Sequence, residues 1–277
     1  MRPRRERLTP PLRSGDLLPP RQLAAAWFLM TLIALLAWVL VIAQADGMGT
    51  DGDMGMGMGA GAGTMGMSLS LFLLLWVAMM AAMMFPSVAP VAVTWARAIG
   101  RQASGAARLL RTTLFVTGYL LAWAVFGLLV YGLLVLFGDL VQGHPQAARW
   151  IGTGAFLAAA VQQFSPLKNI CLRHCRSPMS QLVRYAGFRT RARDLRVGIH
   201  HGLYCVGCCW GLMIVLIPLG SMNIAAMAAV SVIIFVEKLW RLGPLFASVV
   251  GVVFLVLAVL TALGLLQDVL LPGLRGA

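Results

Sequence analysis

The sequence predicts an all-α protein, a polytopic transmembrane helical bundle with about seven spans. Three observations lead to this prediction. Of the 277 residues, 60% are hydrophobic and only 11% are charged, whereas about a quarter of the residues in a soluble domain are charged. Apolar runs of roughly 20 residues, the length that crosses a bilayer as a helix, recur along the chain. Basic residues are concentrated in alternate segments between these runs, as the positive-inside rule describes.

The apolar runs predict the individual spans. The first three and the last are clear, whereas the fourth and sixth are shorter and the fifth carries several polar residues. If the region 199–236 is partly re-entrant, the count falls to about six. The predicted spans are Leu23–Ala43, Leu69–Trp95, Thr112–Phe137, Ala148–Phe164, Ile199–Pro218, Met222–Val236 and Leu245–Leu266.

The basic residues predict the orientation. Three segments are rich in arginine: 1–22, 96–111 and 165–198. Two segments between them contain no Lys or Arg: 44–68 and 138–147. If the N-terminus is cytoplasmic, all of the 22 basic residues except Arg149 and Arg275 fall on the cytoplasmic side. We therefore expect a multi-pass protein of a bacterial-type inner membrane with an extracytoplasmic C-terminus, and the net charge of +13 needs no nucleic-acid partner.

These assignments divide the chain into a tail, a first helix, a loop and a main helical domain. A cleaved signal peptide is the alternative for the first helix, but its apolar stretch is longer than the 7–15 residues of a signal sequence. The predicted parts are a basic cytoplasmic tail (1–22), the first transmembrane helix (23–43), a Gly- and Met-rich extracytoplasmic loop (44–68), the main transmembrane domain (69–266) with its cytoplasmic loop (165–198), and a short C-terminal tail (267–277).

All five cysteines fall near the predicted cytoplasmic face: Cys171, Cys175, Cys205, Cys208 and Cys209. On a helix, the spacing of His201 and the last three cysteines places all four on one stripe. The cytosol keeps thiols reduced, so a disulfide framework is not expected. Cysteine in a membrane helix can be only a small apolar residue, but two tight groups interleaved with histidines favour a metal site. Thiolates with imidazole suit Cu(I), Zn(II) or an iron–sulfur cluster.

Methionines form a second pattern. Met79, Met80, Met83 and Met84 line about half of the second predicted span near its middle. Thioethers favour Cu(I), although methionine also fills irregular gaps between helices. The predicted extracytoplasmic loop 44–68 adds Met-x-Met repeats. The sulfur ligands thus follow one another from thioethers outside the membrane, through thioethers in its middle, to thiols on the cytoplasmic side. This is the order of increasing ligand strength that inward handling of a soft monovalent metal requires.

Glu237 and Lys238 end the sixth predicted span at the cytoplasmic boundary. A charge buried in a membrane is costly and suggests a functional role, whereas a charge at the interface is much cheaper. Glu237 is four residues from Arg241, so it can pair with that residue on a helix. Anchoring of the helix end and metal ligation by Glu237 both remain open.

At these residues the chain resembles domain-of-unknown-function family 2182, a family of predicted metal-binding integral membrane proteins. The resemblance covers roughly residues 70–240 and extends to Glu237-Lys238. The most specific string is Cys205-Val-Gly-Cys208-Cys209-Trp210; the others are Met79-Met80-Ala-Ala-Met83-Met84 with Pro86 and the segment from Lys168 to Cys175. The resemblance implies an inner-membrane location and a metal role.

We therefore expect an integral membrane metal-binding protein that handles or transfers copper(I) rather than an enzyme. Its expected partners are the lipid bilayer and a metallochaperone or a metalloenzyme under assembly. Two alternatives stay open: a membrane thiol–disulfide oxidoreductase using Cys205 and Cys208, and a structural zinc or iron–sulfur site. The predicted ligands are Cys205, Cys208 and Cys209, with Cys171, Cys175, His201 and Glu237 as further candidates and Met79, Met80, Met83 and Met84 as a transit or holding site.

Overall fold

The computed structural model describes residues 20–50, 68–100, 105–143, 145–176, 192–220 and 223–265. In these ranges the chain forms helices and no strands, which confirms the predicted all-α fold class. The helices are α1 (Pro20–Thr50), α2 (Leu69–Gly100), α3 (Gly105–Gly143), α4 (Pro145–Phe164), α5 (Pro166–Arg176), α7 (Arg193–Ile214), α8 (Leu216–Leu219), α9 (Ile224–Leu239) and α10 (Gly243–Ala262).

Four helices in the described part of the chain are long and apolar enough to cross a membrane. Many of their large apolar side chains are exposed, for example Leu129 on α3 and Leu245 on α10, which is compatible with contact to lipid. The other predicted spans also correspond to helices, α1, α4 and α9, which are not among these four, so the count of about seven spans is not confirmed. The four candidate spans are Leu69–Trp95, Gly105–Leu136, Arg193–Ile214 and Gly243–Ala262.

Several helix boundaries differ from the predicted ones. Helix α1 continues to Thr50, into the segment predicted as a loop. The fifth predicted span is divided into α7 and α8 by a turn at Val215. The predicted cytoplasmic loop 165–198 contains α5 and the start of α7. Much of the predicted N-terminal tail, Gly- and Met-rich loop, cytoplasmic loop and C-terminal tail lies outside the described residues: 1–19, 51–67, 177–191 and 266–277.

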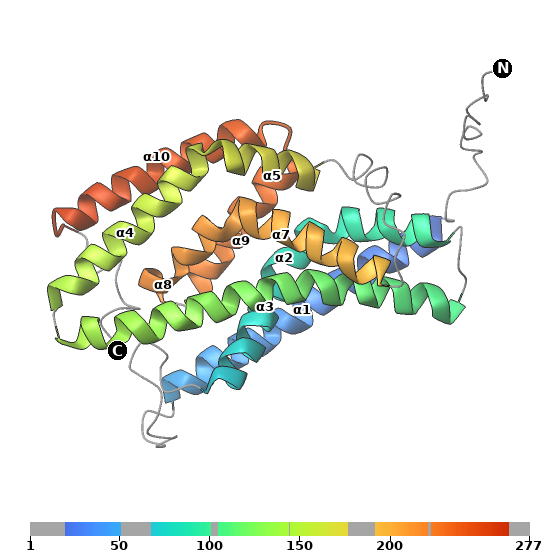
Figure 1. Cartoon of the computed structure of the whole chain (residues 1–277), viewed down its shortest axis with the longest axis horizontal. Coiled ribbons are helices and arrows are strands. Elements are labelled where there is room, and N and C mark those ends of the chain that lie inside the picture. Colours follow the sequence, from blue (N-terminus) through green and yellow to red (C-terminus); the bar gives the residue numbers. More distant parts are fainter. Residues whose placement is uncertain are drawn as a thin grey trace, which may run out of the picture.

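The helices are arranged around α7 and α9. Figure 1 shows α4 and α10 side by side along one edge of the molecule and α1, α2 and α3 together along the other, with α7 and α9 between them. Helix α7 packs against α3, α4, α5 and α9. The middle of α7, which carries three of the five cysteines, is therefore enclosed by other helices.

Helices α3 and α7 approach closely because small residues face each other. A Cβ atom added at Gly198 of α7 would lie 2.1 Å from the carbonyl oxygen of Phe115 on α3. At Gly118 of α3, a Cβ atom would lie 2.3 Å from the carbonyl oxygen of Leu195 on α7. Gly198 and Gly202 also form a Gly-x-x-x-Gly pattern, which allows two helix backbones to touch. The close packing fixes the position of α7 relative to α3.

An ion pair fixes the start of α7. Arg111 of α3 donates two hydrogen bonds to Asp194, from Nε to Oδ2 at 2.9 Å and from Nη2 to Oδ1 at 3.2 Å. Such a two-point contact between guanidinium and carboxylate defines orientation as well as distance. Asp194 lies in the first turn of α7, where a negative charge interacts favourably with the helix dipole. The ion pair and the glycine contacts together set the register of α7 along α3.

Candidate metal centre

Three cysteine sulfur atoms form a compact buried group in the middle of α7. Cys205, Cys208 and Cys209 are each no more than 1% exposed, and their sulfur atoms all lie within 4.8 Å of one another. The Sγ atoms of Cys208 and Cys209 are 3.3 Å apart. The spacing i, i+3, i+4 produces this arrangement, because it places the three side chains on one face of the helix. We call this group the thiol cluster.

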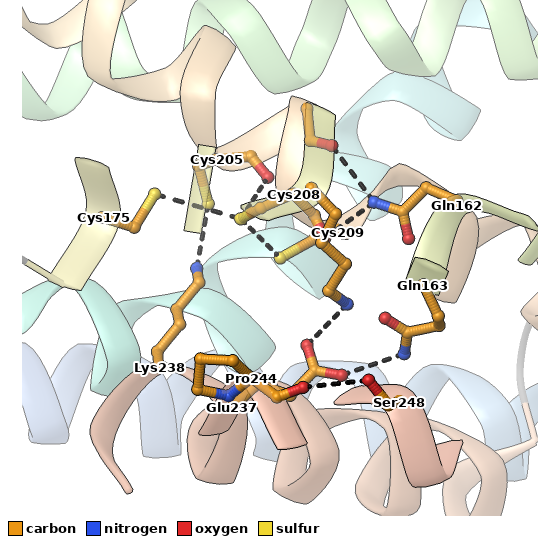
Figure 2. Close-up of polar contacts among 12 residues, drawn as sticks. Gln162, Gln163, Cys175, Cys205, Cys208, Cys209, Glu237, Lys238, Pro244 and Ser248 are labelled. Atoms are coloured by element: carbon orange, nitrogen blue, oxygen red, sulfur yellow. Dashed lines mark hydrogen bonds and ion pairs between the residues drawn. The ribbon is translucent and has the colours of Figure 1, made fainter. Parts of the chain in front are cut away.

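Helix α5 adds a fourth sulfur atom to the edge of the thiol cluster. Cys175 Sγ lies 3.9 Å from Cys208 Sγ, and Figure 2 shows the Cys175 side chain pointing toward it. Cys171, one turn earlier on α5, packs instead against Gly207, where an added Cβ atom would lie 2.8 Å from the Cys171 sulfur. Cys175 is therefore better placed than Cys171 to join the cluster.

Cys205 also has two polar neighbours from other helices. The hydroxyl group of Tyr119 on α3 lies 3.1 Å from Cys205 Sγ. The ammonium group of Lys238, in the last turn of α9, donates to the same sulfur at 3.1 Å (Figure 2). Hydrogen bonds from a cation stabilise a thiolate more than a neutral thiol. Of the three thiol-cluster residues, Cys205 thus has the surroundings that best suit a negatively charged sulfur.

The predicted methionines are all buried on α2. Met79, Met80, Met83 and Met84 are each no more than 4% exposed, and all four belong to the same hydrophobic core as the thiol cluster. Met84 has a further contact, since its Sδ lies 4.0 Å from Nζ of Lys238, which also contacts Cys205. The structure therefore connects one of the four predicted thioethers to the thiol cluster through Lys238.

Glu237 is buried in a polar group rather than paired with Arg241. Its Oε2 accepts a hydrogen bond from Lys168 Nζ at 2.7 Å, and its Oε1 accepts one from Gln163 Nε2 at 2.9 Å. Arg241 lies beyond the end of α9 and is exposed, whereas Glu237 is 1% exposed and faces α4 and α5. Both carboxylate oxygens are thus engaged by α4 and α5, and the carboxylate is not part of the thiol cluster.

His201 is buried next to Tyr119 but outside the thiol cluster. Its ring stacks against the rings of Tyr119 and Phe115, with centroids 6.0 and 6.1 Å apart. Its Nδ1 has no hydrogen-bond partner among the described residues. The predicted helical stripe is correct in spacing, yet the imidazole ring is directed toward α3. His201 therefore contacts the cluster through Tyr119, which itself reaches Cys205.

Two glutamines on α4 were not anticipated from the sequence. Gln162 Nε2 donates to the carbonyl oxygens of Gly207 and Cys208 at 3.1 and 3.0 Å, and Gln163 binds Glu237 as described (Figure 2). Both glutamines are 3% exposed. The available signal was an adjacent polar pair at the end of an otherwise apolar helix, because polar residues within a span face the protein interior. These contacts fasten the backbone of the thiol cluster to α4.

The donor set defines the class of protein. Several buried thiols from two helices could hold a soft metal ion, since thiolate and thioether ligands select Cu(I), Zn(II) or iron–sulfur clusters. The chain belongs to the PpoB2 family, described as copper chaperones, whose match covers residues 73–261. The matched region contains all five cysteines and the four α2 methionines. No curated protein and no solved structure matches the chain.

The family match agrees with the sequence-based expectation in part. It supports a copper-related family, as the metal role of the resemblance implied, but it does not support the name of domain-of-unknown-function family 2182. The match also favours copper among the metals that thiols can bind. The thiol cluster and the family together support copper handling by this chain.

Proposed function

We propose that this protein is a membrane-embedded copper chaperone that holds Cu(I) in the thiol cluster and releases it to a partner protein. The observation that carries the proposal is the group of three buried sulfur atoms within 4.8 Å of one another in a chain of a copper chaperone family. Cys205, Cys208 and Cys209 are the proposed principal ligands, and Cys175 is the proposed fourth. The partner would be a soluble metallochaperone or a metalloenzyme under assembly.

The chemistry of the thiol cluster favours Cu(I) over harder ions. Among the described residues, the cluster contains sulfur ligands and no carboxylate. Hard cations such as Mg²⁺ and Ca²⁺ require oxygen ligands. The burial of the three cysteines also excludes bulk water, which would otherwise hydrate a small divalent ion. A monovalent ion that prefers few soft ligands fits these conditions.

The methionines of α2 provide the proposed route toward the thiols. A thioether is neutral and need not lose a proton before it binds Cu(I), so it binds more weakly than a thiolate and releases the ion more easily. Met79, Met80, Met83 and Met84 would hold the ion in transit, and Met84 is connected to the cluster through Lys238. We further propose that α2, α3, α7 and α10 cross an inner membrane with the thiol cluster toward the cytoplasmic side.

Elemental analysis of the purified protein tests the proposed function. We expect the full-length chain, purified in detergent under reducing and anaerobic conditions, to bind Cu(I), and the variant with Cys205, Cys208 and Cys209 replaced by Ser to lose it. Serine preserves the size of the side chain and removes the soft ligand. Unchanged copper stoichiometry in this variant would exclude the thiol cluster as the site. Zinc or iron in the wild-type protein in place of copper would instead indicate a structural site.

Cys171→Ser is the matched control. This cysteine is buried and shares α5 with Cys175, but it packs against Gly207 and lies apart from the thiol cluster. We therefore expect Cys171→Ser to retain the copper stoichiometry of the wild-type protein, whereas Cys175→Ser weakens copper binding. Equal losses in the two variants would show that both α5 cysteines act as ligands.

A further inference from the structure

Lys238 places a buried ammonium group at the edge of the thiol cluster. The residue is 6% exposed, and its Nζ lies 3.1 Å from Cys205 Sγ, 3.3 Å from Ser87 Oγ and 4.0 Å from Met84 Sδ. An ammonium group has three N–H donors and no acceptor. Each of these three neighbours can act as an acceptor, so the space they surround is suited to a cation.

The Lys238 nitrogen lies between two kinds of sulfur ligand. Met84 belongs to the methionine helix α2, and Cys205 belongs to the thiol cluster on α7. Both sulfur atoms lie within 4.0 Å of the same Lys238 nitrogen. A thioether and a thiolate are both ligands for Cu(I). An ion bound at this position would have one ligand from each of the two groups.

We propose that the Lys238 ammonium group holds the place of Cu(I) at a handover position formed by Met84 and Cys205. The proposal rests on the copper function proposed above. When Cu(I) arrives, it takes the two sulfur atoms as ligands and the ammonium group moves away. One positive charge leaves and one enters, so the net charge of the buried position does not change. A divalent ion would leave an additional buried charge, which is costly in an apolar interior.

The position of Lys238 in its helix allows this movement. Lys238 lies in the last turn of α9, where the free carbonyl groups of the helix end attract a cation. The next residues, Leu239 and Trp240, are exposed, so this end of α9 is at the surface of the molecule. A lysine has a flexible four-carbon stem that can carry its ammonium group toward such a boundary.

The second buried lysine shows why Lys238 is the displaceable one. Lys168 Nζ binds the carboxylate of Glu237 at 2.7 Å, and both side chains are no more than 1% exposed. A buried carboxylate needs this partner permanently, because an unpaired buried charge is strongly destabilising. Lys238 instead contacts the sulfur atom of Cys205, the hydroxyl group of Ser87 and the thioether of Met84. No carboxylate is among these contacts, so the ammonium group can leave this position when Cu(I) binds the two sulfur atoms.

Copper stoichiometry in Lys238 variants tests the proposal. The full-length protein in detergent, reduced and anaerobic, is titrated with Cu(I) in competition with a chromogenic Cu(I) chelator. In the wild-type protein the ammonium group returns to the handover position once the ion has passed to the thiol cluster. Lys238→Leu has no group that can return, so we expect it to keep an ion there and to bind about one more Cu(I) ion per chain than the wild-type protein. Adding Met84→Leu to that variant removes a ligand of this position and returns the stoichiometry to the wild-type value. Lys238→Arg keeps the charge and therefore keeps the wild-type value.

The outcomes separate this proposal from the function on which it rests. If Lys238→Leu binds the same amount of Cu(I) as the wild-type protein, or less, the place-holding role is wrong while the copper site stands. If the wild-type protein binds no copper, the proposed function itself fails. Met227→Leu is the control for Met84→Leu, since Met227 is a fully buried methionine about three helical turns from Lys238 on α9.

Loading kinetics provide a second measurement in case Lys238→Leu does not fold. In the wild-type background, we expect Met84→Leu to slow the transfer of Cu(I) to the thiol cluster several-fold, because the handover position then lacks one of its two ligands. Met227→Leu should load at the wild-type rate. Equal loading rates for the Met84 and Met227 variants would overturn the handover position.

Discussion

At the scale of single residues, the polar group next to the thiol cluster is held together by charge. Lys168 Nζ and Glu237 Oε2 are 2.7 Å apart, and both side chains are almost fully buried. Gln163 donates a hydrogen bond to the second carboxylate oxygen at 2.9 Å. A buried charge is tolerated when it is paired and its remaining lone pairs are hydrogen-bonded. The three residues therefore connect α4, α5 and α9.

We predict that breaking this pair from one side destabilises the protein. Lys168→Met leaves the carboxylate of Glu237 buried without its cation, which costs about 3–5 kcal/mol. Combining it with Glu237→Gln removes both charges, so the double variant should recover most of this loss. Thermal unfolding of the detergent-solubilised protein, followed by tryptophan fluorescence, measures both effects. A double variant as unstable as the sum of the two single variants would contradict the pairing.

The grouping of the three cysteines on one helix face could be predicted from the sequence, but the burial of Lys168 and Lys238 could not. The spacing of Cys205, Cys208 and Cys209 specifies one helix face wherever the helix is placed. Burial of a lysine, in contrast, depends on partners far away in the chain. Lys168 is 69 positions from its partner Glu237, and Lys238 is 151 positions from Ser87. From sequence alone Lys168 is an ordinary basic residue of a cytoplasmic loop.

At the scale of helices, glycines on α7 determine how closely its neighbours approach. The backbone of α3 contacts Gly198 directly, and the sulfur of Cys171 on α5 fills the space that a side chain at Gly207 would occupy. Larger side chains at these positions would move α3 and α5 outward. Since α5 carries Cys175 and α3 carries Tyr119, these glycines also set the distances of both residues to the thiol cluster.

We predict opposite effects for two Gly→Ala substitutions in helices. Alanine normally stabilises a helix interior by about 1 kcal/mol relative to glycine. At Gly132 of α3, an added Cβ atom meets nothing within 4 Å, so Gly132→Ala should keep or raise the unfolding temperature. At Gly198 it would lie 2.1 Å from the backbone of Phe115, so Gly198→Ala should lower that temperature by separating α3 from α7. A Gly198→Ala protein as stable as Gly132→Ala would contradict the close contact.

The sequence predicted where helices exist better than where they end. Apolar runs mark every long helix, because burial or lipid contact requires them. The turn at Val215 that divides α7 from α8, and the extension of α1 to Thr50, have no strong local signal in the sequence. Helix α5 was within a predicted loop, although the four-residue spacing of Cys171 and Cys175 already indicated one helix face there.

At the scale of the whole molecule, the arginine-rich segments meet on one side of the bundle. Arg111, from the segment 96–111, binds Asp194 in the segment 165–198. Arg176, from the same long segment, donates to the carbonyl oxygens of Glu237 and Arg241 at 2.9 and 3.3 Å. These two segments and the end of α9, which carries Lys238 and precedes Arg241, were predicted to lie on one side of a membrane from charge alone. Their mutual contacts are compatible with that prediction.

Fusion reporters at the two chain ends test both the orientation and the number of spans. Green fluorescent protein fluoresces when it remains in the bacterial cytoplasm, and alkaline phosphatase is active only after export, where its disulfides form. An odd number of spans places the two termini on opposite sides. With about seven spans and a cytoplasmic N-terminus, the N-terminal fluorescent fusion should be bright and the C-terminal phosphatase fusion active. A bright C-terminal fluorescent fusion with an inactive phosphatase fusion would instead require an even number, as expected if region 199–236 is re-entrant. In that case α9, with Lys238 in its last turn, would not cross the bilayer as a separate span.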